Sequence, residues 1–173
     1  MRKFLLEGLT RRPLTEPVPG PSDLHLEGAG EQVRSVLNRR LGRSLSIRMV
    51  DAGSCNGCEL EINALGNPFY DLERFGLRFV ASPRHADVLM VTGPVTKNMA
   101  EALLRTYDAM PDPKWVVAVG DCARGGGCFA GSYAISGGVE SILTVDLYID
   151  GCPPAPIDLL KGLLAILEDA ARV

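Results

Sequence analysis

The chain has 173 residues, of which 46% are hydrophobic and 23% are charged, values that are ordinary for a soluble globular protein. A net charge of −3 and an aromatic content of 6% argue against a nucleic-acid-binding surface, and no apolar run approaches the roughly 18 residues of a membrane span. The charge is uneven, because residues 1–50 carry nine Lys and Arg against five Asp and Glu, whereas residues 51–173 carry nine against sixteen. A basic N-terminal region either contacts a partner or an anionic lipid, or is simply solvated.

The sequence divides into an expected N-terminal arm, residues 1–45, and an expected folded domain, residues 46–173. Four prolines between positions 13 and 21 exclude a continuous helix there and indicate an extended connector. A short amphipathic piece precedes the connector, and residues 31–41 place apolar side chains at helical spacing after it. We expect each amphipathic piece to dock on a partner or on the chain's own domain.

The start of the chain carries an arginine pair but no export signal that we can identify. Arg11 and Arg12 are followed by Pro13 and Glu16, where an exported protein would have an apolar stretch. The sequence therefore predicts a cytoplasmic location.

From residue 46 onward, strand and helix patterns alternate. The expected strands are 46–50, 77–80, 87–91, 115–119 and 145–149, and the expected helices are 59–65, 98–110 and 157–172. Thr96 or Asn98 is suited to cap the second helix, and Pro156 to begin the third. Continuous apolar strands that alternate with helices predict an α/β fold with an open, mainly parallel sheet and helices on both faces.

All five cysteines follow expected strands. Cys55 and Cys58 come after the first strand, Cys122 and Cys128 after strand 115–119, and Cys152 after strand 145–149. In an open parallel sheet, function gathers at the carboxyl ends of the strands. An odd number of cysteines in a cytoplasmic chain argues against a disulfide framework and favours metal or redox chemistry.

Four thiolates from three separate loops can close around one tetrahedral site. The candidate ligands are Cys55, Cys58, Cys122 and Cys152, and their spacing alone does not distinguish a 4Fe-4S cluster from structural zinc. A helix N-terminus after the first strand is expected to favour the thiolate form of the first pair. Cys128 is left over, and we expect it to be a small buried hydrophobe.

Two other features lie beside the candidate ligands. Gly120 and the run Gly125–Gly127 are expected to let backbone amides approach the inorganic sulfur atoms of a cluster. The run lacks the Lys-Ser/Thr of a phosphate-binding P-loop. Glu59 and Glu61 are candidates for a proton relay, with Glu61 slightly favoured. The alternative is that they cap or solvate a helix.

Four segments of the chain resemble one known family. They are Gly-Ser-Cys-Asn-Gly-Cys-Glu-Leu-Glu-Ile (53–62), Ala-Asp-Val-Leu-Met-Val-Thr-Gly-Pro-Val-Thr (86–96), Gly-Asp-Cys-Ala (120–123) and Val-Asp-Leu-Tyr-Ile-Asp-Gly-Cys-Pro-Pro-Ala-Pro (145–156). The family comprises the small, cluster-carrying subunit of membrane-bound nickel–iron hydrogenases and the homologous 20 kDa subunit of respiratory complex I. The resemblance covers about residues 46–170 in the same order, and Gly-Cys-Pro-Pro after Val-Asp is its most specific motif.

The resemblance implies a flavodoxin-like fold and one 4Fe-4S cluster on Cys55, Cys58, Cys122 and Cys152. The spaced cysteine pair is similar to the formate hydrogenlyase and hydrogenase-4 (group 4) branch, whereas complex I subunits usually have two adjacent cysteines at this point. It also implies an electron-transfer subunit that is peripheral on the cytoplasmic face of the inner membrane.

The implied partners are a nickel–iron large subunit that holds the active site, a ferredoxin-like iron–sulfur subunit and integral membrane subunits. Two other interpretations stay open at this point. One is a complex I-like subunit that passes electrons to quinone, and the other is a zinc-stapled binding module with no redox role.

Overall fold

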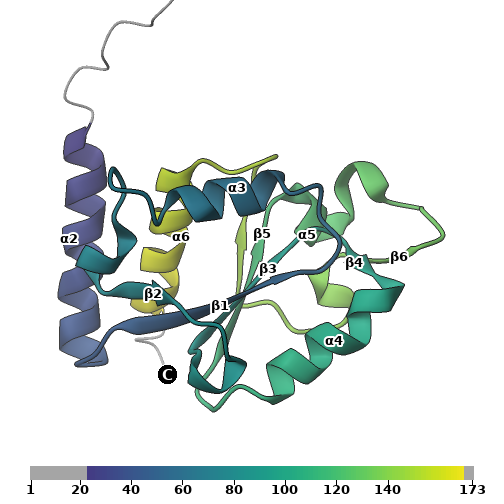
Figure 1. The fold of residues 1–173 in the computed structure, drawn as a ribbon, viewed down its shortest axis with the longest axis horizontal. Coiled ribbons are helices and arrows are strands. Elements are labelled where there is room, and N and C mark those ends of the chain that lie inside the picture. The colour runs from purple at the N-terminus through teal and green to yellow at the C-terminus, as the bar shows by residue number, and fades with distance from the viewer. Residues whose placement is uncertain (1–22, 170–173) are drawn as a thin grey trace, which may run out of the picture.

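The computed structural model describes residues 23–169, and its centre is a sheet of five parallel strands (Figure 1). These are β1 (Leu45–Asp51), β2 (Leu77–Phe79), β3 (Val88–Thr92), β5 (Trp115–Val119) and β7 (Leu147–Ile149). The spatial order β2-β1-β3-β5-β7 is that of flavodoxin-like, doubly wound folds. The predicted α/β fold with a mainly parallel sheet is confirmed.

Helices cover both faces of this sheet. The α-helices are α2 (Asp23–Arg40), α3 (Gly57–Ala64), α4 (Lys97–Asp108), α5 (Asp121–Gly125) and α6 (Pro156–Asp169). Buried side chains of α2, α3 and α6 share one core cluster with the sheet, and those of α4 and α5 share a second cluster on the opposite face. Among residues 23–169, no helix is long and apolar enough to cross a membrane.

Short elements complete the chain outside the main sheet. The antiparallel pair β4 (Val95–Thr96) and β6 (Ile135–Gly137) lies beyond the sheet, near α4 and α5 (Figure 1). Four 3-10 helices occupy the loops, namely η1 (Leu72–Phe75), η2 (Pro83–His85), η3 (Gly127–Phe129) and η4 (Val139–Ser141).

The strands follow the apolar runs of the sequence. Every residue of β3 is buried, as expected for a central parallel strand that is covered on both faces. The expected strand 115–119 is found with the same bounds. The last strand begins later than predicted, at Leu147. The reason is that the Val116 N–H of β5 donates to Asp146 Oδ2, at 2.7 Å, and so bonds to a side chain instead of to the backbone of the neighbouring strand.

α2 belongs to the core of the domain. Its apolar stripe, Leu26, Val33, Val36 and Leu37, is buried, and the helix packs against α6 and η1. Of the two docking modes expected for residues 31–41, the structure shows docking on the chain's own domain. The boundary predicted after residue 45 therefore falls between α2 and the sheet on which α2 packs. The earlier part of the predicted arm, residues 1–22, lies outside the described residues.

Candidate metal centre

The four candidate ligands lie on the edge of the sheet at which β1, β5 and β7 end. Cys55 is in the loop between β1 and α3, and Cys58 is in the first turn of α3. Cys122 is in α5, directly after β5, and Cys152 is in the loop between β7 and α6. We call this side of the molecule, with its four thiols, the cysteine edge.

Side chains within the first loop determine its path. Asp51 Oδ1 accepts the N–H groups of Gly53 at 2.8 Å and Ser54 at 2.7 Å, and Ser54 Oγ accepts that of Asn56 at 3.0 Å. Asn56 has a left-handed backbone, with φ 72°, and directly precedes α3. These bonds turn the chain sharply between the strand and the helix, and so keep Cys55 and Cys58 on the same edge.

The loops after β5 and β7 are bonded to each other. The Gly120 N–H donates to the Ile149 carbonyl at 2.7 Å, and the Asp121 N–H to the Gly151 carbonyl at 3.0 Å. In return, the Gly151 N–H donates to Asp121 Oδ1 at 2.9 Å. The loops that carry Cys122 and Cys152 are therefore held together by the residues that directly precede the two cysteines.

An ion pair joins the same two loops at the surface. The Arg124 guanidinium donates to both carboxylate oxygens of Asp150, at 2.7 and 2.9 Å, and its Cζ lies 4.5 Å from the Tyr148 ring centroid. The sequence analysis did not predict this ion pair, since no local pattern connects residues 26 positions apart. The one hint in the sequence is that Asp150 belongs to the Asp-Gly-Cys motif that carries Cys152.

The four thiols lie within electrostatic range of one another. Burial is the main reason that the pKa of Cys58 rises to about 12, and the charges of Glu59, Cys122, Cys55 and Cys152 raise it further. Burial also raises the pKa of Cys122. For Cys58 the pKa shift is opposite in direction to the one expected from the helix N-terminus, and burial is its main cause. A thiol in such surroundings gives up its proton when a cation takes the proton's place.

Two glycines leave room for the inner sulfur atoms. A Cβ on Gly120 would stand 2.7 Å from Cys58 Sγ, and a Cβ on Gly127 would stand 2.5 Å from Cys122 Sγ. Both glycines have a positive φ, 87° and 52°, which side-chain-bearing residues rarely adopt. The backbone thus lies close to a cysteine sulfur at these two positions, and the approach of amides to inorganic sulfur stays a prediction.

Cys128 is not a buried hydrophobe, as we had expected, but an exposed residue beside Cys122. Its backbone N–H donates to the Cys122 sulfur, and its thiol lies close enough to raise the pKa of Cys122. The left-handed backbone of Gly126 and Gly127 causes the difference, because it turns the chain back around Cys122.

The two acidic candidates differ in their surroundings. Glu59 is 5% exposed, and neither of its carboxylate oxygens has a hydrogen-bond partner among the described residues. Glu61 is partly exposed. A buried carboxyl without a partner is costly, and Glu59 is the one that lies beside Cys58.

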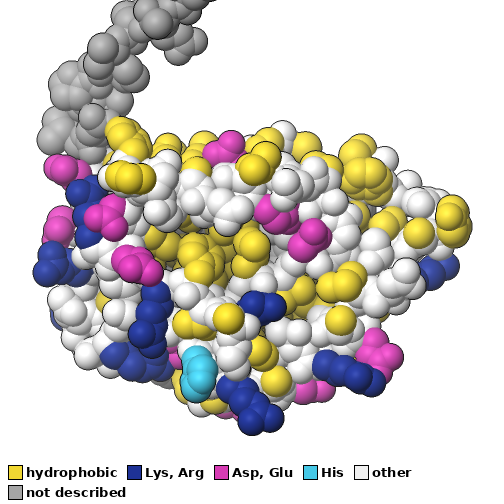
Figure 2. Space-filling view, viewed as in Figure 1, with side chains coloured by type: hydrophobic (Ala, Val, Ile, Leu, Met, Phe, Trp, Pro, Cys, Tyr) yellow, Lys and Arg dark blue, Asp and Glu magenta, His cyan; other side chains and the backbone are white. Residues whose placement is uncertain are grey.

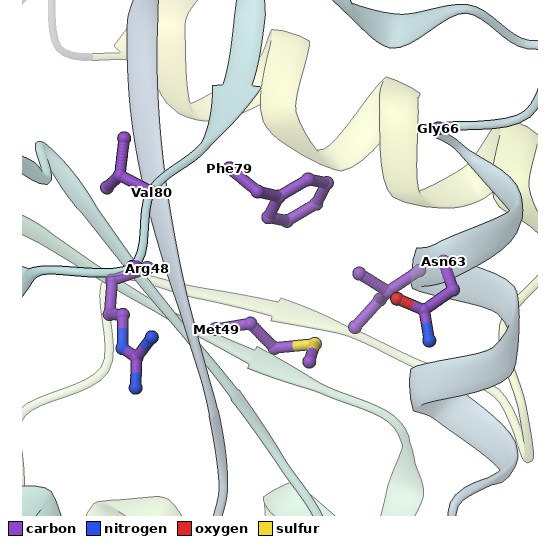
Figure 3. A pocket seen from close by; sticks show the side chains of 8 residues that line it. Arg48, Met49, Asn63, Gly66, Phe79 and Val80 are labelled. Atoms are coloured by element: carbon purple, nitrogen blue, oxygen red, sulfur yellow. The ribbon is translucent and has the colours of Figure 1, made fainter.

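An apolar hollow lies between α3 and the first two strands. It has a volume of about 360 Å³ and is lined by Met49, Ile62, Phe79 and Val80, together with Arg48, Asn63, Gly66 and Ala81. Met49 and Phe79 point from the strands towards Asn63 on α3, whereas Arg48 lies on the other side of β1 (Figure 3). Hydrophobic side chains are also exposed near the cysteines, among them Leu60 on α3, which is 61% exposed.

Within residues 23–169, no three His, Cys, Asp or Glu side chains surround one point closely enough to hold a single metal ion. Of the four thiols, Cys58 and Cys122 are half-buried and Cys55 and Cys152 are exposed. The donor set is all sulfur, which suits soft metals and iron–sulfur clusters.

Comparison with known proteins gives a consistent result. The family described as NADH ubiquinone oxidoreductase, 20 Kd subunit, matches residues 55–166. The chain is 42% identical over 151 residues to formate hydrogenlyase subunit 7 of Escherichia coli K12, covering 86% of this chain and 59% of that protein. It is 46% identical over 133 residues to the probable membrane-bound hydrogenase subunit mbhJ of Pyrococcus furiosus, covering 77% and 80% of the two chains.

A solved structure is also similar. A chain of the membrane-bound sulfane sulfur reductase (MBS), an archaeal respiratory membrane complex, matches with a TM-score of 0.66 and 35% identity. The match covers 77% of this chain and 73% of that chain.

Proposed function

The chain belongs to the family of the 20 kDa subunit of NADH ubiquinone oxidoreductase, and we propose that it is the electron-transfer subunit of a membrane-bound nickel–iron hydrogenase complex. The observation that carries the proposal is the cysteine edge, where three loops of the sheet bring four thiols together. The similarity to formate hydrogenlyase subunit 7 and mbhJ supports the hydrogenase branch of the family.

Cys55, Cys58, Cys122 and Cys152 would hold one 4Fe-4S cluster, which supplies one-electron transfer when bound. The donor set fits, because four thiolates are the ligands that such a cluster takes. The glycines at positions 120 and 127 fit as well, since a side chain at either would displace a ligand sulfur.

Other residues of this chain would set the properties of the site. The Cys128 N–H donates to the Cys122 sulfur and so stabilises negative charge there. Glu59 is placed to hold a proton beside the ligands, and of the two candidates for a relay it is the buried one. Glu61, which is nearer to solvent, would exchange that proton with the outside.

The active site would lie on a partner large subunit that carries nickel and iron. This chain has a single Cys-x-x-Cys pair, Cys55 and Cys58, and both members are assigned to the cluster. The other proposed partners are a ferredoxin-like iron–sulfur subunit and integral membrane subunits. The chain would be peripheral on the cytoplasmic face of the membrane.

A second candidate function is the transfer of electrons to quinone, as in complex I. The apolar hollow beside α3 favours it, because a quinone ring needs an apolar cavity near the cluster. The spaced Cys55–Cys58 pair speaks for the hydrogenase branch.

The test is anaerobic purification of the complex through this chain, followed by metal analysis and EPR of the dithionite-reduced sample. We expect about four irons bound to this chain and nickel in a co-purifying large subunit. Iron without nickel, in a complex that reduces quinone, would support the second candidate. Zinc as the only metal would contradict both.

A further inference from the structure

Arginines gather at the edge of the sheet opposite the cysteine edge. Because all five strands are parallel, the segments that precede them meet at one edge, and the segments that follow them meet at the other. We define the arginine corner as Arg34 and Arg39 from the second half of α2, Arg43 from the segment before β1, Arg74 from η1 and Arg78 from β2. Figure 2 shows Lys and Arg side chains in this region, at the lower left, over the end of α2 and the adjoining strands.

A groove runs through the arginine corner. Its volume is about 240 Å³, and its lining includes the guanidinium-bearing residues Arg34, Arg43 and Arg74. Leu37 and Phe75 give it an apolar floor, since both are buried in the core beneath. Three guanidinium groups therefore line one groove.

The partners of these arginines leave positive charge at the surface. Arg43 is tied by two bonds, at 2.8 and 2.7 Å, to the carboxylate of Asp87, yet its side chain stays 56% exposed. Arg34 approaches Glu31 only to 3.7 Å, in a pair exposed to solvent on both sides. Such a pair is weak and is easily exchanged for another anion.

The remaining arginines are held by neutral groups. The Arg74 guanidinium lies over the Phe75 ring, 4.5 Å from its centroid, and pairs with no carboxylate among the described residues. Arg78 Nε donates to Ser46 Oγ at 3.0 Å, and Arg39 Nε to the Ser35 carbonyl at 3.3 Å. The acidic groups that face the corner are Glu31, Glu73 and Asp87, so arginines outnumber carboxylates by five to three.

We propose that the arginine corner binds phosphate groups of anionic phospholipids at a membrane surface. Guanidinium groups match phosphate oxygens with two parallel hydrogen bonds, and every cation of the corner is an arginine. Five arginines spread over an α-helix end and two strand starts suit a charged surface better than one small anion. This goes beyond the proposed electron transfer, because the corner and the cysteine edge lie at opposite ends of the strands.

The test is binding of the full chain to phosphatidylcholine vesicles with and without phosphatidylglycerol, measured by co-sedimentation at about 0.15 M salt. The test variant is Arg34→Gln/Arg74→Gln. Its matched control, Arg105→Gln/Lys161→Gln, removes two exposed cations from α4 and α6 and changes the net charge by the same amount. Thermal unfolding and metal content of both variants check that they are folded.

Each arginine near an anionic surface is expected to contribute about fivefold, so the test variant should bind phosphatidylglycerol vesicles about 25-fold more weakly. The control should bind like the parent chain, and vesicles of phosphatidylcholine alone should bind none of them. An equal loss in both variants would show that net charge alone decides binding and would overturn the proposal. Binding of inorganic phosphate that the test variant loses, without vesicle binding, would identify a free phosphate site and overturn the lipid assignment.

Discussion

At the scale of single residues, Gly127 is constrained both by its left-handed backbone and by its closeness to the Cys122 sulfur. Changing Gly127 to Ala places a methyl group 2.5 Å from Cys122 Sγ at a φ of 52°. We expect the variant to lose most of its iron, measured by metal analysis after anaerobic purification. Gly125→Ala is the matched control, because a Cβ at Gly125 meets nothing within 4 Å. Equal iron in both variants would show that Cys122 Sγ moves aside without cost.

The assignment of four ligands, with Cys128 excluded, makes a separate prediction. Cys152→Ala should abolish the cluster, whereas Cys128→Ala should retain it, since alanine at position 128 keeps the backbone N–H that bonds to Cys122. Iron content and the EPR signal of the reduced chain are the measurements. If iron falls equally in both, Cys128 is a ligand and the proposed set is wrong.

Replacing the Glu59 carboxylate with an apolar side chain should make the chain more stable and the complex less active. Its buried carboxylate has no partner among the described residues, so Glu59→Met, which is similar in length and apolar, should raise the free energy of unfolding by about 1–3 kcal/mol. The same change should lower hydrogen evolution by the complex, because the proposed relay is lost. Glu61→Met, at a partly exposed position, should leave stability nearly unchanged. A lower free energy of unfolding for Glu59→Met would show instead that the carboxylate stabilises the folded chain.

Sequence reasoning could place the cysteines but not their surroundings. Positions 55, 58, 122 and 152 were predicted to share an edge because each follows an apolar strand, and they do share it. The burial of Glu59 and the exposure of Cys128 depend on how α3 and η3 pack, which no spacing in the sequence encodes.

At the scale of elements, α2 shows that tertiary packing overrides local propensity. The spacing of residues 31–41 predicted a helix there, but the helix starts at Asp23 and includes Gly28 and Gly30. Glycine disfavours a helix interior, by about 1 kcal/mol relative to alanine. Gly30 is nevertheless needed, because a Cβ there would stand 2.3 Å from the Phe75 ring of η1. Because Phe75 is 45 positions away in the sequence, no local pattern could predict its contact with Gly30.

The packing of α2 can be measured directly. Leu37→Ala should lower the free energy of unfolding by about 2–5 kcal/mol in urea, because Leu37 is 2% exposed and its removal leaves a cavity. Leu104→Ala on α4 removes the same atoms from a side chain that is 42% exposed, and should cost at most about 0.5 kcal/mol. Similar losses in the two variants would show that α2 contributes no more to the core than a surface helix does.

The strands were easier to predict than the helices and short elements. A largely buried strand such as β5 is marked by five consecutive apolar residues, and its bounds were found as expected. The helix predicted over 98–110 begins at Lys97, and of the two cap candidates Thr96 accepts the Met99 N–H at 3.3 Å. The pair β4 and β6 was missed, because two- and three-residue strands carry no periodicity.

At the scale of the whole molecule, the cysteine edge should be the surface that meets the proposed large subunit. Leu60 is 61% exposed on α3, two positions after Cys58. Leu60→Glu should reduce co-purification of the nickel-bearing subunit by about tenfold or more while iron in this chain is retained. Leu104→Glu, on the other face of the sheet, should leave co-purification unchanged. Retention of the partner by Leu60→Glu would place the interface elsewhere.

The bonds between the loops after β5 and β7 have a consequence for biogenesis. A ribosome delivers Cys55 and Cys58 first, but the Asp121–Gly151 bonds that position Cys122 and Cys152 form only when the last strand of the sheet, β7, has been added beside β5. A nascent chain therefore presents two of the four candidate thiols while the greater part of the domain is still being synthesised. The proposed cluster would therefore find its full ligand set only after the sheet has closed.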